Sequence, residues 1–121
     1  STGIQNKFNS VFNRLSEFCK IEPPSLLHGD LWSGNFIFSE QSVYLIDPAV
    51  YYGNREVDLA MSRLFGGFHT DFYNAYNEAY PLLPGYEERF DLYNLYPLLV
   101  HLILFGNNYY SQILRILNRY A

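Results

Sequence analysis

The chain has almost no cysteine and no excess of basic residues. Cys19 is its one cysteine, so no disulfide can form within the chain, and a reducing compartment such as the cytoplasm is expected. The eight Lys and Arg residues are outnumbered by twelve Asp and Glu residues, which gives a formal net charge of −4. Since nucleic-acid-binding surfaces are strongly basic, we expect no nucleic-acid partner.

A long apolar run is also missing. The most apolar stretch, residues 95–105, is interrupted by Pro97 and His101 and is much shorter than the roughly 20 residues of a membrane helix. It therefore predicts a buried helix and no membrane association. Hydrophobic residues make up 49% of the 121-residue chain and aromatic residues 19%, which excludes a disordered protein and predicts a single domain over residues 1–121.

The residues that can carry chemistry follow two apolar runs. Asp30 and Asn35 come after Leu26–Leu27, and Asp47 comes directly after residues 43–46. Carboxylate and amide oxygens can accept a proton and can bind a hard divalent cation. The alternative is that these are ordinary turn residues, but two such motifs in order, each after an apolar run, argue against it.

The spacing of these residues matches the catalytic loop of protein kinases. In kinases an Asn follows the Asp of a His-Arg-Asp motif, and a second metal-binding Asp opens an Asp-Phe-Gly motif. Here Asp30 and Asn35 have the same offset, and Asp47 opens the second motif. We predict that Asp30 is the general base that orients the attacking hydroxyl, and that Asn35 and Asp47 bind Mg²⁺ beside the phosphates of ATP.

The longer motifs resemble those of the fructosamine kinase (ketosamine-3-kinase) family, a branch of the aminoglycoside and choline kinase-like phosphotransferases. They are His-Gly-Asp-Leu-Trp-Ser-Gly-Asn at 28–35, Asp-Pro-Ala-Val-Tyr-Tyr-Gly-Asn-Arg-Glu-Val-Asp-Leu-Ala-Met at 47–61 and Leu-Phe-Gly-Gly-Phe at 64–68. The resemblance covers most of the chain from about Pro24 onward. It implies an α+β, mainly α-helical fold: the C-terminal lobe of a protein-kinase-like (aminoglycoside phosphotransferase-like) fold with one catalytic β-hairpin.

The resemblance also implies an activity. The family's enzymes are ATP-dependent kinases that phosphorylate the sugar of ketosamines, which are fructosamine or ribulosamine adducts of lysine, and so initiate deglycation. The expected substrate is a small-molecule or protein-bound ketosamine. Two alternatives stay open: a kinase for another small hydroxyl compound of aminoglycoside, choline or homoserine type, and a non-catalytic lobe or interaction fragment.

A kinase of this class needs an N-terminal lobe with a Gly-rich loop and a phosphate-binding Lys. The glycines before residue 54 are scattered, and Lys7 and Lys20 lie in a helical pattern. We therefore expect the chain to be the C-terminal lobe of a longer kinase, with the missing N-terminal lobe as its partner. Alone it should be inactive, and its exposed, apolar lobe interface should favour self-association.

Further residues are candidates for roles around the site. Ile37 and Ile46 are expected to form the floor of the adenine pocket, with plain hairpin core as the alternative. Trp32 is expected either to stack on the sugar of the substrate or to pack between loop and helix. His28 is expected to brace the catalytic loop. Asp58 either braces the same loop, as the superfamily's Asp at this position implies, or favours a helix dipole.

Three other residues are left with simpler expectations. Arg55 is expected either to pair with a carboxylate or to contact substrate. His69 and His101 are expected to be structural, because neither has a partner at metal-ligand spacing.

Apolar periodicity predicts the elements. Residues 4–20 should form an amphipathic helix that packs under the catalytic loop and ends before Pro23, and Leu26–Leu27 should form a short strand. The apolar runs 36–38 and 43–46 predict a β-hairpin that brings Asn35 and Asp47 to the same end. Other helices are expected over 55–65 with Asn54 as N-cap, over 70–80 capped by Thr70 or Asp71, from 87 to 105 with a kink at Pro97, and after a cap at Asn107 or Asn108.

Overall fold

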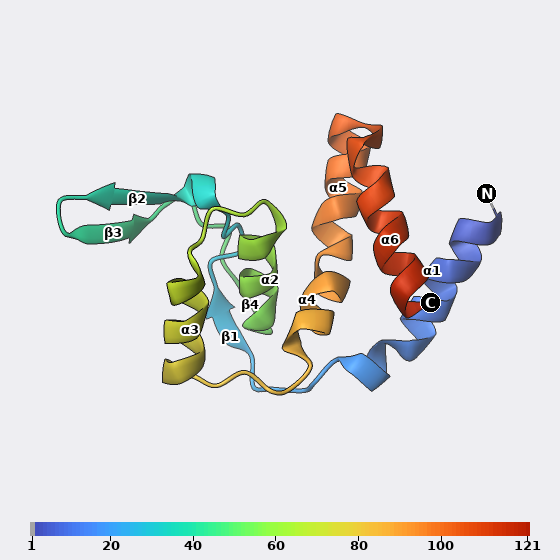
Figure 1. Cartoon of the computed structure of the whole chain (residues 1–121), viewed down its shortest axis with the longest axis horizontal. Helices are drawn as coiled ribbons and strands as arrows, with labels where there is room; N and C mark the ends of the chain where they lie inside the picture. The colour runs from blue at the N-terminus through green and yellow to red at the C-terminus, as the bar shows by residue number, and fades with distance from the viewer. Residues whose placement is uncertain (1) are drawn as a thin grey trace.

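Helices dominate the structure, and two small antiparallel sheets lie beside them (Figure 1). The structure is a computed structural model that describes residues 2–121. The helices are α1 (Thr2–Phe18), α2 (Glu56–Leu64), α3 (Thr70–Ala79), α4 (Tyr86–Tyr93), α5 (Leu95–Phe105) and α6 (Tyr110–Tyr120), with 3₁₀ turns η1 (Ser33–Asn35) and η2 (Asn107–Tyr109). The strands are β1 (Ser25–Leu27), β2 (Phe36–Ser39), β3 (Ser42–Leu45) and β4 (Tyr51–Gly53).

Two hydrophobic clusters hold these elements together. The first lies between α1, α5 and α6 and includes Val11, Leu98 and Leu117, all of which are fully buried. The second lies around α2 and includes Leu59. Helix α4 joins the two, because Leu92 belongs to the first cluster and Phe90 to the second. The hairpin β2–β3 projects from the part of the molecule that carries the second cluster (Figure 1).

The expected N-terminal helix is confirmed as α1, but its predicted position is wrong. Helix α1 packs against α6 at the end of the molecule away from the hairpin, and not under the catalytic loop (Figure 1). The ring of Phe18 meets that of Tyr120 edge-on, with 5.7 Å between centroids. The apolar stripe of α1 predicts that one face is buried, but it carries no information on which apolar face of the protein will cover it.

The strand at Leu26–Leu27 is confirmed as β1, and its partner is β4, in a segment where the sequence predicts only a loop. The strands are antiparallel, with Leu27 opposite Tyr51. A three-residue strand is too short to show periodicity, so only its long-range partner defines it. This pairing brings together the two ends of the segment that carries all the candidate catalytic and metal-binding residues.

The expected kinked helix from 87 to 105 is instead two helices, α4 and α5, separated at Asn94. The buried side chain of Asn94 donates a hydrogen bond from Nδ2 to the carbonyl of Ala60 in α2, at 2.8 Å. Pro97 lies in the first turn of α5, where its missing N–H costs no helical hydrogen bond. In a continuous helix the ring of Pro97 would meet the carbonyl of Tyr93, the last residue of α4, so the break lies where the proline requires it, and the bond from Asn94 to Ala60 fixes it against α2.

Three predicted helix caps differ from the structure. Helix α3 is capped by His69, whose Nδ1 accepts a hydrogen bond from the backbone of Asp71 at 3.1 Å, and not by Thr70 or Asp71. Helix α6 follows the 3₁₀ turn η2, so Asn107 and Asn108 belong to that turn instead of capping the helix. The N-cap residue of α2 is Arg55, one residue after the predicted Asn54, although Oδ1 of Asn54 still accepts a hydrogen bond from the backbone of Glu56 at 2.9 Å. In the described part of the chain no helix has the length and hydrophobicity needed to cross a bilayer.

Candidate active site

The hairpin brings Asn35 and Asp47 to one end, as expected. Strands β2 and β3 pair with Phe36 opposite Leu45, and beyond this pair the backbone N–H of Ile46 donates to the carbonyl of Asn35 at 2.9 Å. Asp47 follows with a φ of +49°, in the left-handed region that residues other than glycine seldom adopt. This conformation turns the chain out of β3 at the residue predicted to bind metal.

Asn35 also holds the side chain of Asp30. Its amide Nδ2 donates to the backbone carbonyl of Asp30 at 2.9 Å and to the carboxylate Oδ2 at 3.0 Å. Asn35 is buried, and Asp30 is half-buried. Because both bonds use the amide nitrogen, they leave the Oδ1 oxygen of Asn35 for a cation. One side chain can thus orient the carboxylate predicted to be catalytic and ligate a metal.

Asp58 supports the catalytic loop from α2. Its carboxylate accepts hydrogen bonds from the backbone N–H groups of His28, at 2.7 Å, and Gly29, at 3.0 Å. Of the two interpretations left open for Asp58, the contacts are those of a loop brace.

Gly29 has a φ of +87°, and a Cβ there would overlap the carbonyl oxygen of Ala49. Burial, together with the nearby Asp58 carboxylate, raises the pKa of Tyr51.

His28 connects the two motifs. Its Nδ1 accepts from the backbone N–H of Asp30 at 3.2 Å, and its Nε2 lies 2.8 Å from the carbonyl of Ile46. A backbone N–H can only donate, so Nδ1 is the acceptor and Nε2 carries the proton that bonds Ile46. The imidazole therefore ties the loop of Asp30 to the residue that precedes Asp47.

Ile37 and Ile46 lie on one face of the hairpin. Ile37 pairs with Tyr44 and Phe36 with Leu45, and beyond these pairs the N–H of Ile46 bonds the carbonyl of Asn35. Successive pairs of a hairpin alternate between its faces, so Ile46 falls on the same face as Ile37. Ile37 is 48% exposed. This exposed face adjoins the predicted metal ligands. If the phosphates of ATP lay beside the metal, the nucleotide base would lie against this face.

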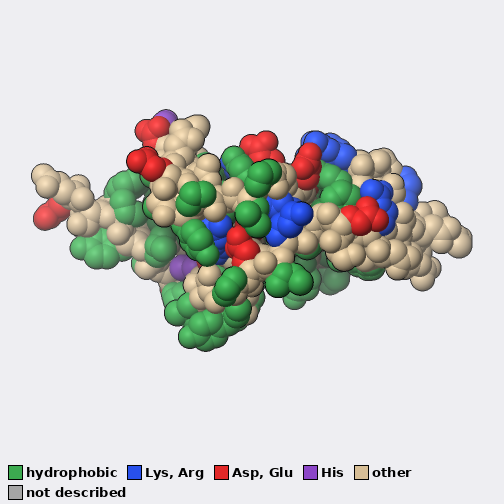
Figure 2. Space-filling model, turned by 90° about the horizontal axis from the view of Figure 1, so that it is seen from below, with side chains coloured by type: hydrophobic (Ala, Val, Ile, Leu, Met, Phe, Trp, Pro, Cys, Tyr) green, Lys and Arg blue, Asp and Glu red, His purple; other side chains and the backbone are tan. Residues whose placement is uncertain are grey.

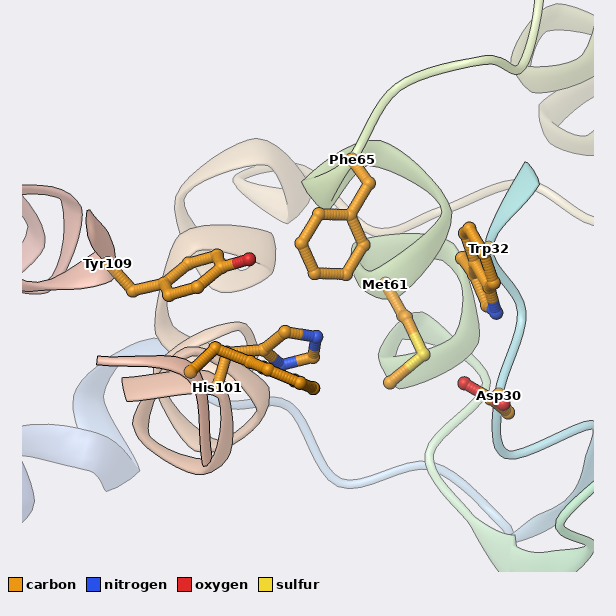
Figure 3. Close-up of a pocket in the computed structure, with 7 residues that line it drawn as sticks. Asp30, Trp32, Met61, Phe65, His101 and Tyr109 are labelled. Carbon is orange, nitrogen blue, oxygen red and sulfur yellow. The ribbon is translucent and has the colours of Figure 1, made fainter. Parts of the chain in front are cut away.

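A pocket of about 450 Å³ opens beside Asp30 (Figure 3). Asp30 and Trp32 stand on one side, His101 stands opposite, and Met61 and Phe65 lie between them (Figure 3). Trp32 remains 40% exposed, and the Nδ1 of His101 lies 2.7 Å from the carbonyl of Pro97. The residues that line the pocket are Asp30, Trp32, Met61, Phe65, His101, Phe105 and Tyr109.

Most of these pocket residues escape prediction from sequence. Met61 and Phe65 fit a helical apolar pattern, and Phe105 and Tyr109 lie far along the chain from Asp30. Their spacing is that of core positions, so no local signal separates a pocket wall from a core face. Only the packing of α5 beside the catalytic segment brings them together.

Arg55 does not reach the pocket. Its guanidinium donates to the Glu22 carboxylate from Nε at 3.0 Å and from a terminal nitrogen at 3.2 Å, and it also bonds the carbonyls of Tyr80 and Pro81. Of the two possibilities left open for Arg55, the structure therefore shows the carboxylate pair. Hydrogen bonding to Arg55 lowers the pKa of Glu22.

The donor set suits a cation that is shared with a ligand. Among residues 2–121 no group of three or more His, Cys, Asp and Glu side chains is placed to hold a metal. The predicted ligands, the amide oxygen of Asn35 and the carboxylate of Asp47, are hard oxygens. Mg²⁺ typically takes one or two such protein ligands and completes its shell with waters and substrate phosphates. The residues present fit that pattern.

This arrangement defines the class of protein. In protein-kinase-like phosphotransferases the catalytic Asp and the metal-binding Asn lie on one loop, and the second metal-binding Asp lies on a following turn. The same order and placement are found here, on a largely helical body (Figure 1). The chain has the fold of the C-terminal lobe of that class. The fructosamine kinase family model matches residues 2–121, and the chain belongs to that family.

Individual relatives agree with this assignment. The chain is 58% identical over 98 residues to a Lactiplantibacillus plantarum protein named "Probable ketoamine kinase", covering 80% of this chain and 35% of the relative. It is 44% identical over 94 residues to "Ketosamine-3-kinase" of Mus musculus, covering 78% and 30%. A Thermobifida fusca crystal structure described as "putative fructosamine-3-kinase" superposes with a TM-score of 0.89 at 39% identity, over 98% of this chain and 42% of that one. The chain spans about a third of the length of the curated relatives it matches.

Proposed function

We propose that the chain is the catalytic lobe of a longer, cytoplasmic kinase that uses ATP and Mg²⁺ to phosphorylate the sugar of ketosamines. The substrates are fructosamine or ribulosamine adducts of lysine, and phosphorylation initiates deglycation. Membership of the fructosamine kinase family supports the reaction. The observation that carries the proposal is the position of Asp30, held by Asn35 at the wall of a pocket of about 450 Å³.

In this proposal Asp30 aligns the attacking hydroxyl and accepts its proton. Phosphoryl transfer has a loose transition state, so alignment of the hydroxyl matters more than strong basicity. The Asn35 amide and the His28–Asp30 backbone bond keep the carboxylate in one position. Asn35 and Asp47 hold Mg²⁺, which neutralises charge on the phosphates of ATP.

The pocket beside Asp30 suits the sugar of the acceptor. Aromatic rings pack well against the C–H faces of sugars, and the walls here carry Trp32, Phe65 and Phe105. The polar Asp30 lies on one side of this apolar enclosure, where a single sugar hydroxyl can approach it. Ile37 and Ile46 provide the floor for adenine on the adjoining hairpin face.

The test uses the longer protein that carries this chain. Fructosyl-lysine should be phosphorylated in preference to an aminoglycoside, choline or homoserine, all assayed with ATP and Mg²⁺. Asp30→Asn should lower turnover by about 10²- to 10⁴-fold, because it removes the proton acceptor but keeps the hydrogen bond from Asn35. The matched control is Asp71→Asn, on the exposed first turn of α3, which should retain activity.

Two results would contradict the proposal. Preference for one of the other acceptors would move the protein to a different branch of the same superfamily. Full turnover by Asp30→Asn would remove Asp30 from the reaction.

A further inference from the structure

Gly34 lies under the ring of Trp32. A Cβ at position 34 would stand 2.6 Å from Cζ3 of the Trp32 indole and closer still to two neighbouring ring atoms. Real Cβ atoms do not approach other atoms within 3.0 Å, so the ring would have to move. Gly34 is not among the glycines with positive φ, unlike Gly29 and Gly67. A Cβ at this position would therefore displace the indole, while the backbone conformation itself does not call for glycine.

The backbone around Trp32 is fixed independently of its ring. The N–H of Trp32 donates to the carbonyl of Asp30 at 3.1 Å, and the carbonyl of Trp32 accepts from the N–H of Asn35 at 2.9 Å. Both partners are residues that we assign to catalysis. The orientation of the indole is therefore the part of this turn that Gly34 can control.

A second glycine fixes the turn against α2. A Cβ at Gly67 would lie 2.6 Å from Oγ of Ser33, so Gly67 lets the turn approach the segment that follows α2. Met61 of α2 and Phe65, directly after that helix, extend into the pocket beside Trp32 (Figure 3). The close contacts of Gly34 with Trp32 and of Gly67 with Ser33 thus fix the position of the Trp32 side of the pocket relative to its α2 side.

We propose that Gly34 is a positioning residue for the acceptor: by lacking a Cβ it holds the Trp32 indole as the pocket wall beside Asp30. Gly34 does not touch the substrate and acts through Trp32. This inference rests on the proposed function, because it assigns the pocket to the acceptor. It implies that Gly34 affects acceptor binding and alignment and leaves nucleotide binding unchanged.

The activity test is Gly34→Ala in the longer protein. A displacement of the wall by about 1 Å should lower kcat/KM for fructosyl-lysine by roughly 10- to 100-fold, with KM for ATP unchanged. The control for replacing glycine by alanine is Gly3→Ala in α1, where a Cβ meets no atom within 4 Å. An equal loss of kcat/KM for ATP and for the acceptor would overturn the proposal, because it would place the effect at the neighbouring Asn35.

A double-mutant cycle isolates the contact with the ring. In a Trp32→Leu background, Gly34→Ala should cost little in thermal stability or in acceptor kcat/KM, because the clashing ring is absent. If Gly34→Ala alone fails to fold, the double variant should recover folding. If Gly34→Ala lowers thermal stability or acceptor kcat/KM equally in both backgrounds, or if the double variant does not recover folding, the backbone rather than the ring needs glycine at position 34. Either result would overturn the proposal.

Fluorescence provides a readout that needs no activity. Trp32 is the one tryptophan of the 121-residue chain, so the emission of this chain reports on this ring alone. In Gly34→Ala the emission should move to longer wavelength and acrylamide quenching should increase, whereas Gly3→Ala should match the parent. Unchanged emission would overturn the proposal. Failure of the longer protein to phosphorylate any ketosamine would instead refute the proposed function and leave the Trp32–Gly34 coupling measurable.

Discussion

At the scale of single residues, the acids near the start of α2 have quite different tasks. Asp58 turns its carboxylate to two backbone N–H groups of the catalytic loop. Glu56 is 1% exposed and bonds Arg89. For Asp58 the sequence leaves the helix dipole as one option, because acids are common in a first turn. The hydrogen bonds show instead that each acid has a partner that lies far away in the sequence.

We expect Asp58→Asn to loosen the catalytic loop. The amide keeps one accepting oxygen, but its NH₂ group faces one of the two backbone donors, which is left unsatisfied. The free energy of unfolding should fall by about 1–3 kcal/mol, and turnover of the longer protein should fall with it. Denaturant unfolding and steady-state kinetics measure the two effects.

Asp71→Asn again serves as the control, because Asp71 is exposed on α3. Wild-type stability and turnover in Asp58→Asn would show that the brace is dispensable.

At the scale of elements, α2 is the helix to which the surrounding segments are tied. The buried pair of Glu56 and Arg89 joins it to α4 through two bonds of 2.7 Å. Arg55, directly before α2, binds Glu22 in the segment that precedes β1. The remaining donors of Arg89 bond the carbonyls of Leu83 and Pro84. Ion pairs thus fix the segments around α2, which carries the Asp58 brace.

Breaking the buried pair of Glu56 and Arg89 should strongly destabilise the fold. Glu56→Gln leaves the Arg89 charge buried without its counterion, so the free energy of unfolding should fall by about 3–5 kcal/mol. Glu17→Gln breaks the exposed pair with Arg14 and should cost less than about 1 kcal/mol. Urea titration of the two variants makes the comparison. Equal losses of unfolding free energy would refute the distinction between the buried and the exposed pair.

The pair of Glu22 and Arg55 predicts a pH dependence. The folded-state pKa of Glu22 is lowered from 4.5, so its contribution to stability is complete above pH 4.5 and is lost as the pH falls through the folded value. The difference in unfolding free energy between wild type and Glu22→Gln should therefore shrink as the pH is lowered below 4.5. A difference that stays constant with pH would contradict the assignment.

At the scale of the whole molecule, much apolar surface is open. On the face shown in Figure 2, patches of hydrophobic side chains interrupt the polar surface. Phe38 of the hairpin is 73% exposed, and Ile103 and Leu104 of α5 are 80% and 66% exposed. Surfaces of this kind are typical of interfaces. They agree with our proposal that another lobe of a longer protein packs on this one.

We therefore expect the isolated chain to self-associate and to show little or no kinase turnover. Sedimentation velocity should show species whose mass rises with concentration, and Phe38→Lys or Ile103→Lys should reduce that rise. Ser111→Lys, at an exposed polar position of α6, is the matched control and should have no effect. A monomer at every concentration would contradict the prediction of self-association, and turnover at ordinary kinase rates would contradict that of inactivity.

Local patterns were enough for several parts of this protein. Helix α1, the hairpin and the placement of Asn35 and Asp47 at one end of it follow from apolar periodicity and from a short turn. The spacing of Asp30 and Asn35 predicts the reaction class that we propose, because that chemistry needs both residues on one loop. These features depend on residues that are close together along the chain, so local patterns are sufficient to predict them.

The other features follow from long-range packing. The pairing of β4 with β1, the contact of Asn94 with α2, the position of α1 on α6 and the pocket wall from α5 each depend on a partner far away in the sequence. Periodicity marks a face as buried but does not name what covers it. The close fit of Trp32 over Gly34 is likewise a matter of atomic overlap, which only packed side chains reveal.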